Sequence, residues 1–292
     1  MPGSSALPSL RRGDEVPAAE WHAAFTEAFA DYLIGPFVLT LAQWPGFLAR
    51  QGVDLALSRA AMVRGELASF ALVAPRPATR RWRLATMGAR PSARGSGAAA
   101  ALLDDFIGRA TGTGLATVEL EVFAANERAW RLYRGRGFDV VHPLMGYEHA
   151  GTAARRPAPA VEAVPLLAAW SWLAEAEARI ADLPLQVTAP VLRVAASAAP
   201  RSHPLQAWRH GSAQMVFAEQ PSGAAVVVHS LIDDEPGQRL RAGLAEALLA
   251  MYPGRTLRVP ALQRPDLGGQ ALERAGFVPQ PLHQWLMRRA LG

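Results

Sequence analysis

Neither cysteine nor lysine occurs among the 292 residues of the chain. The lack of cysteine excludes disulfide bonds, zinc sites built on thiolates and a cysteine nucleophile, and it leaves the redox compartment open. Arginine supplies all 30 basic residues, which we interpret as a bias of genome composition. The seven histidines show none of the spacings typical of metal sites, so the sequence predicts no bound metal.

Long hydrophobic runs and clusters of one charge are also missing. No apolar stretch reaches the roughly 18 residues that a membrane helix needs, and the amino-terminal segment contains no apolar targeting sequence. The formal net charge of +5 is small for this length, and the arginines form no basic run beside aromatic residues. We therefore expect a cytoplasmic protein that binds neither membranes nor nucleic acid.

Half of the residues are hydrophobic and 19% are charged, which favours packed domains over disorder. At about 100–200 residues per domain, the length predicts two domains. The segment 151–161 is rich in proline, alanine and arginine, as is typical of a linker. The sequence therefore predicts domains at 1–150 and 162–292.

The first half predicts strands and helices after a loose tail at residues 1–16. Apolar residues at helical spacing predict helices over 20–32 and 36–50, the second bent at Trp44-Pro45. A hairpin turning at Arg64-Gly65 is expected next. The elements expected from residue 54 onward are, in order, strands over 54–62, 66–74 and 80–87, a helix from 98 to Gly112 or Gly114, a strand over 117–123, a helix over 126–136 and a strand over 138–147.

The central motif is the turn Arg94-Gly95-Ser96-Gly97, which precedes the helix that begins at Ala98. Glycines in such a turn let backbone N–H groups converge on an anion, and the positive end of the helix dipole adds to the attraction. Arg94 supplies a permanent cation that can bind phosphate oxygens in a bidentate manner. The pattern indicates a phosphate-binding loop, although Gly-Ser-Gly turns also precede helices that bind no ligand.

With its neighbouring motifs, this loop resembles the GCN5-related N-acetyltransferase (GNAT) superfamily over residues 20–147. The motifs occur in the family's order and spacing, and the upstream ones are similar to those of a bacterial subgroup. They are Phe25-x-x-x-Phe29-x-Asp31-Tyr32-x-x-x-Pro36, Asp54-x-x-x-Ser58, Thr86-Met87-Gly88-Ala89-Arg90-Pro91, Arg94-Gly95-Ser96-Gly97-Ala98-Ala99, Leu120-Glu121-Val122, Asn126-x-x-Ala129-x-x-Leu132-Tyr133 and Gly137-Phe138. The resemblance implies an α/β (α+β) fold with a mixed, mostly antiparallel sheet flanked by helices.

The same resemblance implies that a primary amine attacks acetyl-CoA directly. The glycine turn would hold the pyrophosphate, and backbone groups of Met87 to Ala89 would bind the pantetheine arm and the thioester carbonyl. The implied cofactor-binding residues are Met87, Gly88, Ala89, Arg94, Gly95, Ser96, Gly97, Ala98, Ala99, Asn126 and Ala129. For Asn126, an ordinary helix N-cap is an equally common role.

Family members that acetylate protein amino termini use the Glu of Leu-Glu-Val as base and the Tyr of Leu-Tyr as acid, which here are Glu121 and Tyr133. A phenol with an ordinary pKa of about 10 is protonated at neutral pH and suits the acid role. The ordinary pKa of a glutamate, about 4.3, is low for a base, so Glu121 would need burial or a relaying water. Tyr133 could instead be a packing residue, and Glu121 or Glu119 could be solvated.

For the acceptor, Glu27, Asp31 and Tyr32 lie on the helix segment that borders the substrate groove in this superfamily. Asp31 could hold an ammonium group, although an aspartate near a helix end is more often solvated or capping. The expected partner is the primary amine of a small molecule or a peptide. The alternative is a non-catalytic acyl-CoA-binding sensor or scaffold, and the presence of both predicted catalytic residues favours the enzyme.

The second half repeats features of the first. Gly137-Phe138 recurs 139 residues later as Gly276-Phe277, and the same offset places a helix over 237–245 and a strand over 256–261. At that offset the glycine turn becomes Asp233-Asp234-Glu235-Pro236, a run that we expect to be solvated. Its carboxylates repel a pyrophosphate and its proline lacks an N–H. Unless the Gly-Phe recurrence is chance, the chain comprises two tandem GNAT-like domains, the second degenerate.

Overall fold

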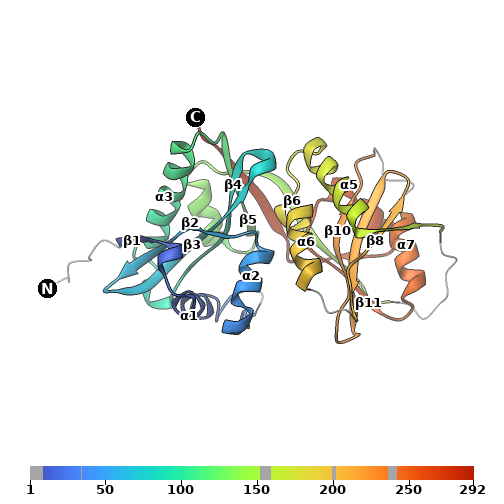
Figure 1. The fold of residues 1–292 in the computed structure, drawn as a ribbon, viewed down its shortest axis with the longest axis horizontal. Helices are drawn as coiled ribbons and strands as arrows, with labels where there is room; N and C mark the ends of the chain where they lie inside the picture. The colour runs from blue at the N-terminus through green and yellow to red at the C-terminus, as the bar shows by residue number, and fades with distance from the viewer. Residues whose placement is uncertain (1–8, 34, 152–158, 199–201, 236–241) are drawn as a thin grey trace. The chain divides into compact units, whose positions relative to one another are not determined.

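The computed structural model describes residues 9–33, 35–151, 159–198, 202–235 and 242–292. The chain divides into two compact units. Unit 1 comprises Met1–Val122, Asn126–Asp139 and Met287–Gly292, and unit 2 comprises Phe123–Ala125 and Val140–Leu286. Each unit contains a mixed, mostly antiparallel sheet with helices packed on it (Figure 1), which is the predicted fold class.

The sheet of unit 1 is formed mainly by the first five strands. The strands are β1 (Ser9–Arg12), β2 (Asp54–Val63), β3 (Glu66–Arg76), β4 (Arg81–Ala89) and β5 (Thr117–Phe123), and the helices are α1 (Ala18–Ala28), α2 (Trp44–Arg50), α3 (Ala98–Gly112) and α4 (Glu127–Arg134). The strands β1 to β4 pair antiparallel in chain order, and β5 runs parallel to β4. The predicted succession of strands and helices from residue 54 onward is confirmed.

Side chains of β3 alternate between the two faces of this sheet. On one face, Phe70 and Leu72 join a hydrophobic cluster with Phe25 of α1 and with residues of α2. On the other face, the ring of Phe106 in α3 lies 6.3 Å from the ring of Trp82 in β4. Burial of large apolar side chains on both faces is the main favourable contribution to the stability of such a layered unit.

The helix predicted over 36–50 begins only at Trp44. A 3-10 turn precedes it, and Thr40 and Gln43 form a capping box at its start. Pro45 therefore lies in the first turn of α2 and does not bend a longer helix. In the first turn the backbone N–H groups have no partner within the helix, so the missing N–H of a proline breaks no helical hydrogen bond. The prediction of this helix was wrong at its start because the apolar pattern continues through a segment that is not α-helical.

The predicted loose tail contains a strand. Ser9–Arg12 forms β1 and pairs with β2 through its backbone, with Leu10 opposite Ala61. All four side chains of β1 are exposed, so the strand has no alternation of apolar and polar residues. It is held by backbone hydrogen bonds, which a sequence-based prediction cannot detect. Residues 1–8 of the tail lie outside the described part of the chain.

The two units exchange segments. Most of β6 (Asp139–His149) belongs to unit 2, whereas Met287–Gly292 belongs to unit 1. There β13 (Gln284–Ala290) neighbours β5, and the Leu291 N–H donates to the Ala116 carbonyl at 2.8 Å. Without β13 one edge of β5 would be unpaired, and the added strand satisfies the backbone groups of that edge. The predicted single boundary at 151–161 therefore does not separate these units, and residues 152–158 lie outside the described part.

Unit 2 has the strand order β6-β11-β10-β9-β8-β7, with β12 beside β6. The pair β10–β11 is parallel and the others are antiparallel. Leu248 and Leu272 lie in one hydrophobic cluster, and Trp170 and Leu173 lie in another. The elements are β7 (Glu162–Val164), α5 (Leu166–Arg179), α6 (Ala189–Ala198), β8 (Gln206–His210), β9 (Ala213–Glu219), β10 (Ala225–Ile232), α7 (Ala242–Met251), β11 (Thr256–Gln263), α8 (Gly269–Arg274) and β12 (Val278–Pro279).

Unit 2 repeats an order of elements found in unit 1. The series β10, α7, parallel β11 and α8 corresponds to β4, α3, parallel β5 and α4. At the ends of α4 and α8, Gly137 and Gly276 take left-handed φ values of +76° and +94°, and the N–H groups of the next residues close the same type of helix ending. This order supports the interpretation of a duplicated domain. Residues 237–241 of the predicted helix lie outside the described part.

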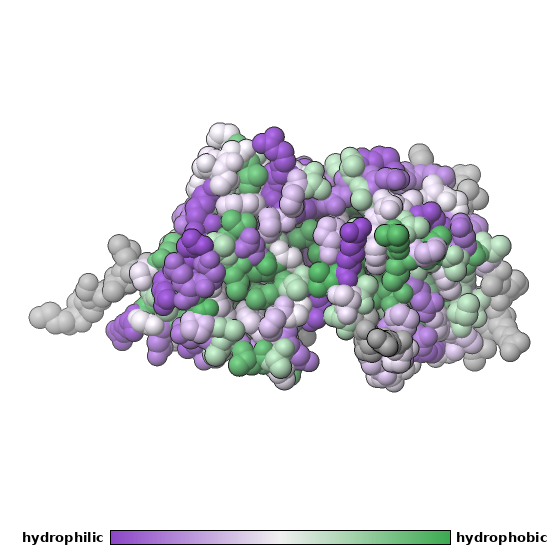
Figure 2. Space-filling model, in the orientation of Figure 1, coloured by the Kyte–Doolittle hydropathy of each residue, from purple (hydrophilic) through white to green (hydrophobic). Residues whose placement is uncertain are grey.

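Polar and apolar side chains are interspersed on the face of the molecule seen in Figure 2. Three of the exposed large hydrophobic residues, Leu33, Val38 and Leu41, follow α1 in unit 1. Within the described ranges, no helix combines the length and the apolar character that crossing a bilayer requires.

Candidate functional site

The predicted phosphate loop is an open turn at the start of α3. Gly95 and Gly97 have left-handed φ values of +83° and +86°, and no described atom lies within 4 Å of a Cβ built on either. The Ser96 hydroxyl donates to the Ala93 carbonyl at 2.7 Å and accepts the Ala98 N–H at 3.3 Å, which fixes the turn internally. Because the N-cap residue is a glycine, no N-cap side chain caps the first turn of α3, and its N–H groups after Ala98 suit an anion.

Arg94 is held by the segment at the end of α1. Its Nη1 and Nη2 atoms each donate to one carboxylate oxygen of Asp31 at 2.6 Å, and Nη2 also donates to the Ala28 carbonyl at 3.1 Å. The hydrogen bonds from Arg94 lower the pKa of Asp31. The Arg90 Nη1 atom forms an ion pair with Glu27 Oε1 at 3.4 Å. The two carboxylates predicted to bind an acceptor amine therefore connect the loop to α1.

The strands β4 and β5 separate beside this loop. Their parallel pairing ends at Leu84 and Leu120, whereas β4 stays paired with β3 as far as Ala89. The register between β3 and β4 skips Ala85, which marks a β-bulge. A bulge bends its strand and redirects its backbone groups. The stretch Met87–Ala89 therefore lies beyond the residues of β4 that pair with β5. A strand needs such a stretch if its backbone is to bind a pantetheine arm.

Gly88 is a point of close packing in this stretch. A Cβ at Gly88 would lie 2.7 Å from the ring of Phe70 and 3.2 Å from Ala28 and Phe29 of the α1 end. A glycine is therefore required for the end of α1 to lie against β4. The ring of Phe29 in turn packs edge-on against Tyr32 at 4.9 Å, so this packing positions Tyr32.

Tyr32, Asn126 and Tyr133, three residues predicted from the sequence, lie together. The Asn126 Oδ1 atom accepts the Ala129 N–H at 3.2 Å as the N-cap of α4. Burial raises the pKa of Tyr32, and the neighbouring Asn126 side chain opposes this rise. The Tyr133 side chain is buried, with 7% of the residue exposed. Burial raises the pKa of Tyr133, and the neighbouring Tyr32 raises it further. The Tyr133 phenol is therefore protonated at neutral pH, as a general acid must be.

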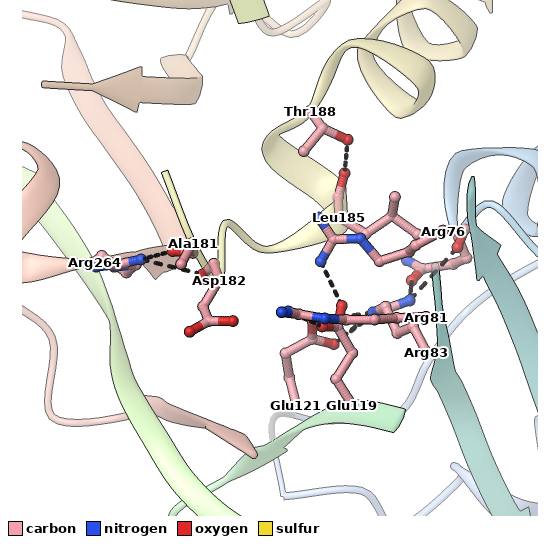
Figure 3. Close-up of polar contacts among 11 residues, drawn as sticks. Arg76, Arg81, Arg83, Glu119, Glu121, Ala181, Asp182, Leu185, Thr188 and Arg264 are labelled. Carbon is pink, nitrogen blue, oxygen red and sulfur yellow. Dashed lines mark hydrogen bonds and ion pairs between the residues drawn. The ribbon is translucent and has the colours of Figure 1, made fainter. Parts of the chain in front are cut away.

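Glu119 and Glu121 of β5 form buried ion pairs (Figure 3). The Arg83 Nε atom donates to both carboxylate oxygens of Glu121, at 2.7 and 3.0 Å, and both side chains are 3% exposed. Glu119 pairs with Arg76 and, at 3.3 Å, with Arg81. The hypothesis that either glutamate is solvated is therefore wrong, because arginines on the neighbouring strands compensate both charges in the interior.

These arginines are not among the site residues predicted from the sequence. A signal for them is present, since Arg81 and Arg83 alternate along β4 as Glu119 and Glu121 alternate along β5. Opposite charges at the same spacing on adjacent strands indicate facing ion pairs once the strand order is known. The order of strands depends on long-range pairing, which the local sequence does not specify.

The acidic segment of unit 2 is structurally different from the open glycine turn. Asp233 is fully buried and accepts the Glu235 N–H at 3.3 Å, so the prediction of a solvated run was wrong at this residue. Asp234 and Glu235 are exposed, and Asp234 pairs with Arg179 at 2.7 Å. Carboxylates at this position oppose the approach of a phosphate. Pro236 lies outside the described residues.

Comparisons with known proteins bear on the fold of the chain. Residues 18–138 match the sequence model of the Acetyltransferase (GNAT) family. No curated protein matches the sequence. Similar solved structures are a GCN5-related N-acetyltransferase from Sphaerobacter thermophilus (TM-score 0.62, 17% identity, 97% of this chain and 96% of that chain), Eis1 from Mycobacterium abscessus (0.58, 18%, 98% and 74%) and a GCN5-related N-acetyltransferase from Anabaena variabilis (0.61, 12%, 98% and 73%).

The chain therefore has the fold of the GCN5-related N-acetyltransferases. More particularly, the chain contains a GNAT acetyltransferase domain at residues 18–138. Domains of this family transfer an acetyl group from acetyl-CoA to an amine. The resemblance seen in the sequence motifs is thereby confirmed.

Proposed function

We propose that unit 1 transfers the acetyl group of acetyl-CoA to a primary amine of a small molecule or peptide by direct attack. The observation that carries this proposal is the open turn at Arg94–Ala98 beside the diverging strands β4 and β5. Backbone N–H groups at a helix start suit a pyrophosphate. The backbone of Met87–Ala89, beyond the β5 pairing, suits the pantetheine arm and the thioester carbonyl.

Tyr133 is the general acid in this proposal. As the bond between the amine nitrogen and the acetyl carbon forms and the carbon–sulfur bond breaks, the Tyr133 hydroxyl gives its proton to the departing sulfur. Its burial keeps the phenol protonated until that step. The nitrogen loses one proton before it attacks and a second after its bond to the acetyl carbon has formed. One of these two protons is released to water, and the other is equivalent to the proton that water returns to Tyr133 after the sulfur has taken the phenol's proton.

Glu121, the predicted base, has a different environment from that of a free carboxylate. Both of its oxygens accept hydrogen bonds from Arg83, which makes direct proton transfer from an ammonium group unfavourable. We propose that the ammonium releases its proton to water. The Glu121–Arg83 pair then serves to hold β5 beside β4 at the point where the two strands diverge.

The proposed function predicts that a primary amine accelerates release of the CoA thiol from acetyl-CoA. The measurement compares amino acids, aminoglycosides and peptides with a free amino terminus, each beside its quaternary trimethylammonium analogue as a control that cannot be acetylated. Mass spectrometry should find acetylated amine in the amount of thiol released. If the protein binds acetyl-CoA but acetylates none of these amines, the non-catalytic sensor or scaffold is favoured and the proposal fails.

A further inference from the structure

The segment 91–97, which contains the glycine turn, makes few contacts that could fix its place. Its residues are exposed apart from the half-buried Ala93, and a Cβ built on Gly95 or Gly97 would meet no described atom within 4 Å outside the adjacent residues. Among the described residues, the backbone hydrogen bonds of this segment join residues at most four positions apart. Local hydrogen bonds of this kind shape the turn, but its position on unit 1 depends on contacts with other elements.

The Arg94 side chain makes such a contact with the end of α1. Its Nη1 and Nη2 atoms donate to the two carboxylate oxygens of Asp31, each at 2.6 Å, and Nη2 also donates to the Ala28 carbonyl at 3.1 Å. Two parallel, charge-assisted hydrogen bonds fix the plane of a guanidinium as well as its position. Within the described part of the chain, Arg94 is the residue of this segment whose side chain hydrogen-bonds another element.

The same hydrogen bonds engage the edges of the guanidinium that a phosphate would use. A guanidinium presents paired N–H groups along two edges, and Nη2 belongs to both of them. The two N–H groups of Nη2 are given to Asp31 and to the Ala28 carbonyl. A bidentate contact between Arg94 and a phosphate would therefore require the guanidinium to leave α1. While it stays bound there, Arg94 acts on a pyrophosphate through the position of the turn.

The end of α1 is a firm support for this contact. Ala28 and Phe29 are buried, and each lies 3.2 Å from the position that a Cβ on Gly88 would take. Asp31 follows two residues after Phe29, and its side chain is 62% exposed. An ion pair as exposed as this one contributes little to the stability of the whole unit. The effect of the Asp31–Arg94 pair is therefore local and falls on the turn.

We propose that Asp31 is a positioning residue for the donor, an inference that rests on the proposed binding of acetyl-CoA by unit 1. The Asp31 carboxylate holds the Arg94 guanidinium, and Arg94 holds the turn in the place where the N–H groups of α3 receive the pyrophosphate. Without Asp31 the turn has to be ordered when CoA binds, which lowers the affinity. The charge of Asp31 alone would have the opposite effect, because removing a carboxylate beside a phosphate site strengthens the binding of an anion.

The test measures the affinity for CoA by calorimetric titration of Asp31→Asn and Asp31→Ala. Asparagine keeps one acceptor oxygen for Arg94, and alanine keeps none. We expect the Kd for CoA to rise about tenfold in Asp31→Ala and by less in Asp31→Asn, with a Tm close to that of the wild type in both. The KM for acetyl-CoA should rise in parallel, whereas kcat at saturating acetyl-CoA and the KM for the acetylated amine should not change.

The matched control is Asp104→Ala on α3. The Asp104 carboxylate accepts hydrogen bonds from Nε and Nη2 of Arg136 at 2.6 and 3.1 Å, and its side chain is 60% exposed, close to the value for Asp31. This variant removes the same charge and the same type of ion pair from the same unit. Because Arg136 lies outside the turn, the affinity of Asp104→Ala for CoA should equal that of the wild type.

Three results would overturn the role of Asp31 and leave the proposed function intact. They are an affinity of Asp31→Ala for CoA that equals or exceeds that of the wild type, an equal loss in Asp104→Ala, and a rise in the KM for the amine alone. The last result would assign Asp31 to the acceptor, as the sequence motif implies. A wild type that binds no CoA overturns both the role of Asp31 and the proposed function.

Discussion

The Tyr133→Phe variant is expected to transfer acetyl groups about a hundredfold more slowly than the wild type, because general acids contribute roughly that factor or more. The physical reason is that a thiolate leaving into a buried site has to be neutralised as the carbon–sulfur bond breaks. Phenylalanine keeps the packing against Phe138 and removes only the hydroxyl. Steady-state kinetics should therefore show a loss in kcat, with a KM for acetyl-CoA close to that of the wild type.

A suitable control is Tyr147→Phe, which removes the hydroxyl of a buried tyrosine in unit 2. That hydroxyl donates to Glu273 at 3.3 Å and has no place in the proposed chemistry. Its removal should leave kcat close to the wild-type value. Equal rates for Tyr133→Phe and the wild type would show that Tyr133 is only a packing residue.

The Glu121→Gln variant is expected to lower the free energy of unfolding by about 3 kcal/mol, the lower end of the range for breaking a buried ion pair. The glutamine leaves the Arg83 guanidinium, whose side chain is 3% exposed, without a compensating charge. Thermal unfolding should register this as a decrease in Tm of roughly 5 °C for a protein of this size.

The matched control for this change is Glu127→Gln. Glu127 also pairs with an arginine, Arg131, but both side chains are more than 70% exposed, and such pairs contribute little to stability. A double variant, Arg83→Met with Glu121→Met, should recover part of the lost stability, because neither position then leaves a buried charge without its partner. If Glu121→Gln is as stable as the wild type yet loses kcat, Glu121 is the base that the sequence motif implies.

Several elements that local patterns specify were predicted correctly. Helical periodicity in α1 and α3 and the turn at Arg64-Gly65 gave elements that the structure contains. The left-handed conformation of Gly95 and Gly97 follows from the same logic, since glycine adopts it at little cost. A motif with a physical reason at each position therefore predicted the open turn.

Features that depend on long-range pairing could not be predicted in this way. The addition of Met287–Gly292 to unit 1 joins segments far apart in the sequence, and the exposed strand β1 carries no apolar pattern. The Arg83–Glu121 pair depends on which strand neighbours β5. The two strand additions depend on backbone hydrogen bonding, and the ion pair depends on charge compensation in the interior. Neither produces a periodic pattern in the local sequence.

Calorimetric titration of CoA into the wild type and two glycine variants most directly tests the claim that the turn before α3 binds the pyrophosphate. Gly97 and Gly65 have nearly the same φ, +86° and +84°, and both have open space for a Cβ, so alanine strains the two turns alike. We predict a single CoA per chain for the wild type and for Gly65→Ala. For Gly97→Ala we predict an affinity about a hundredfold lower, equivalent to about 3 kcal/mol. Equal affinities for the two variants, or no CoA binding by the wild type, would contradict the account.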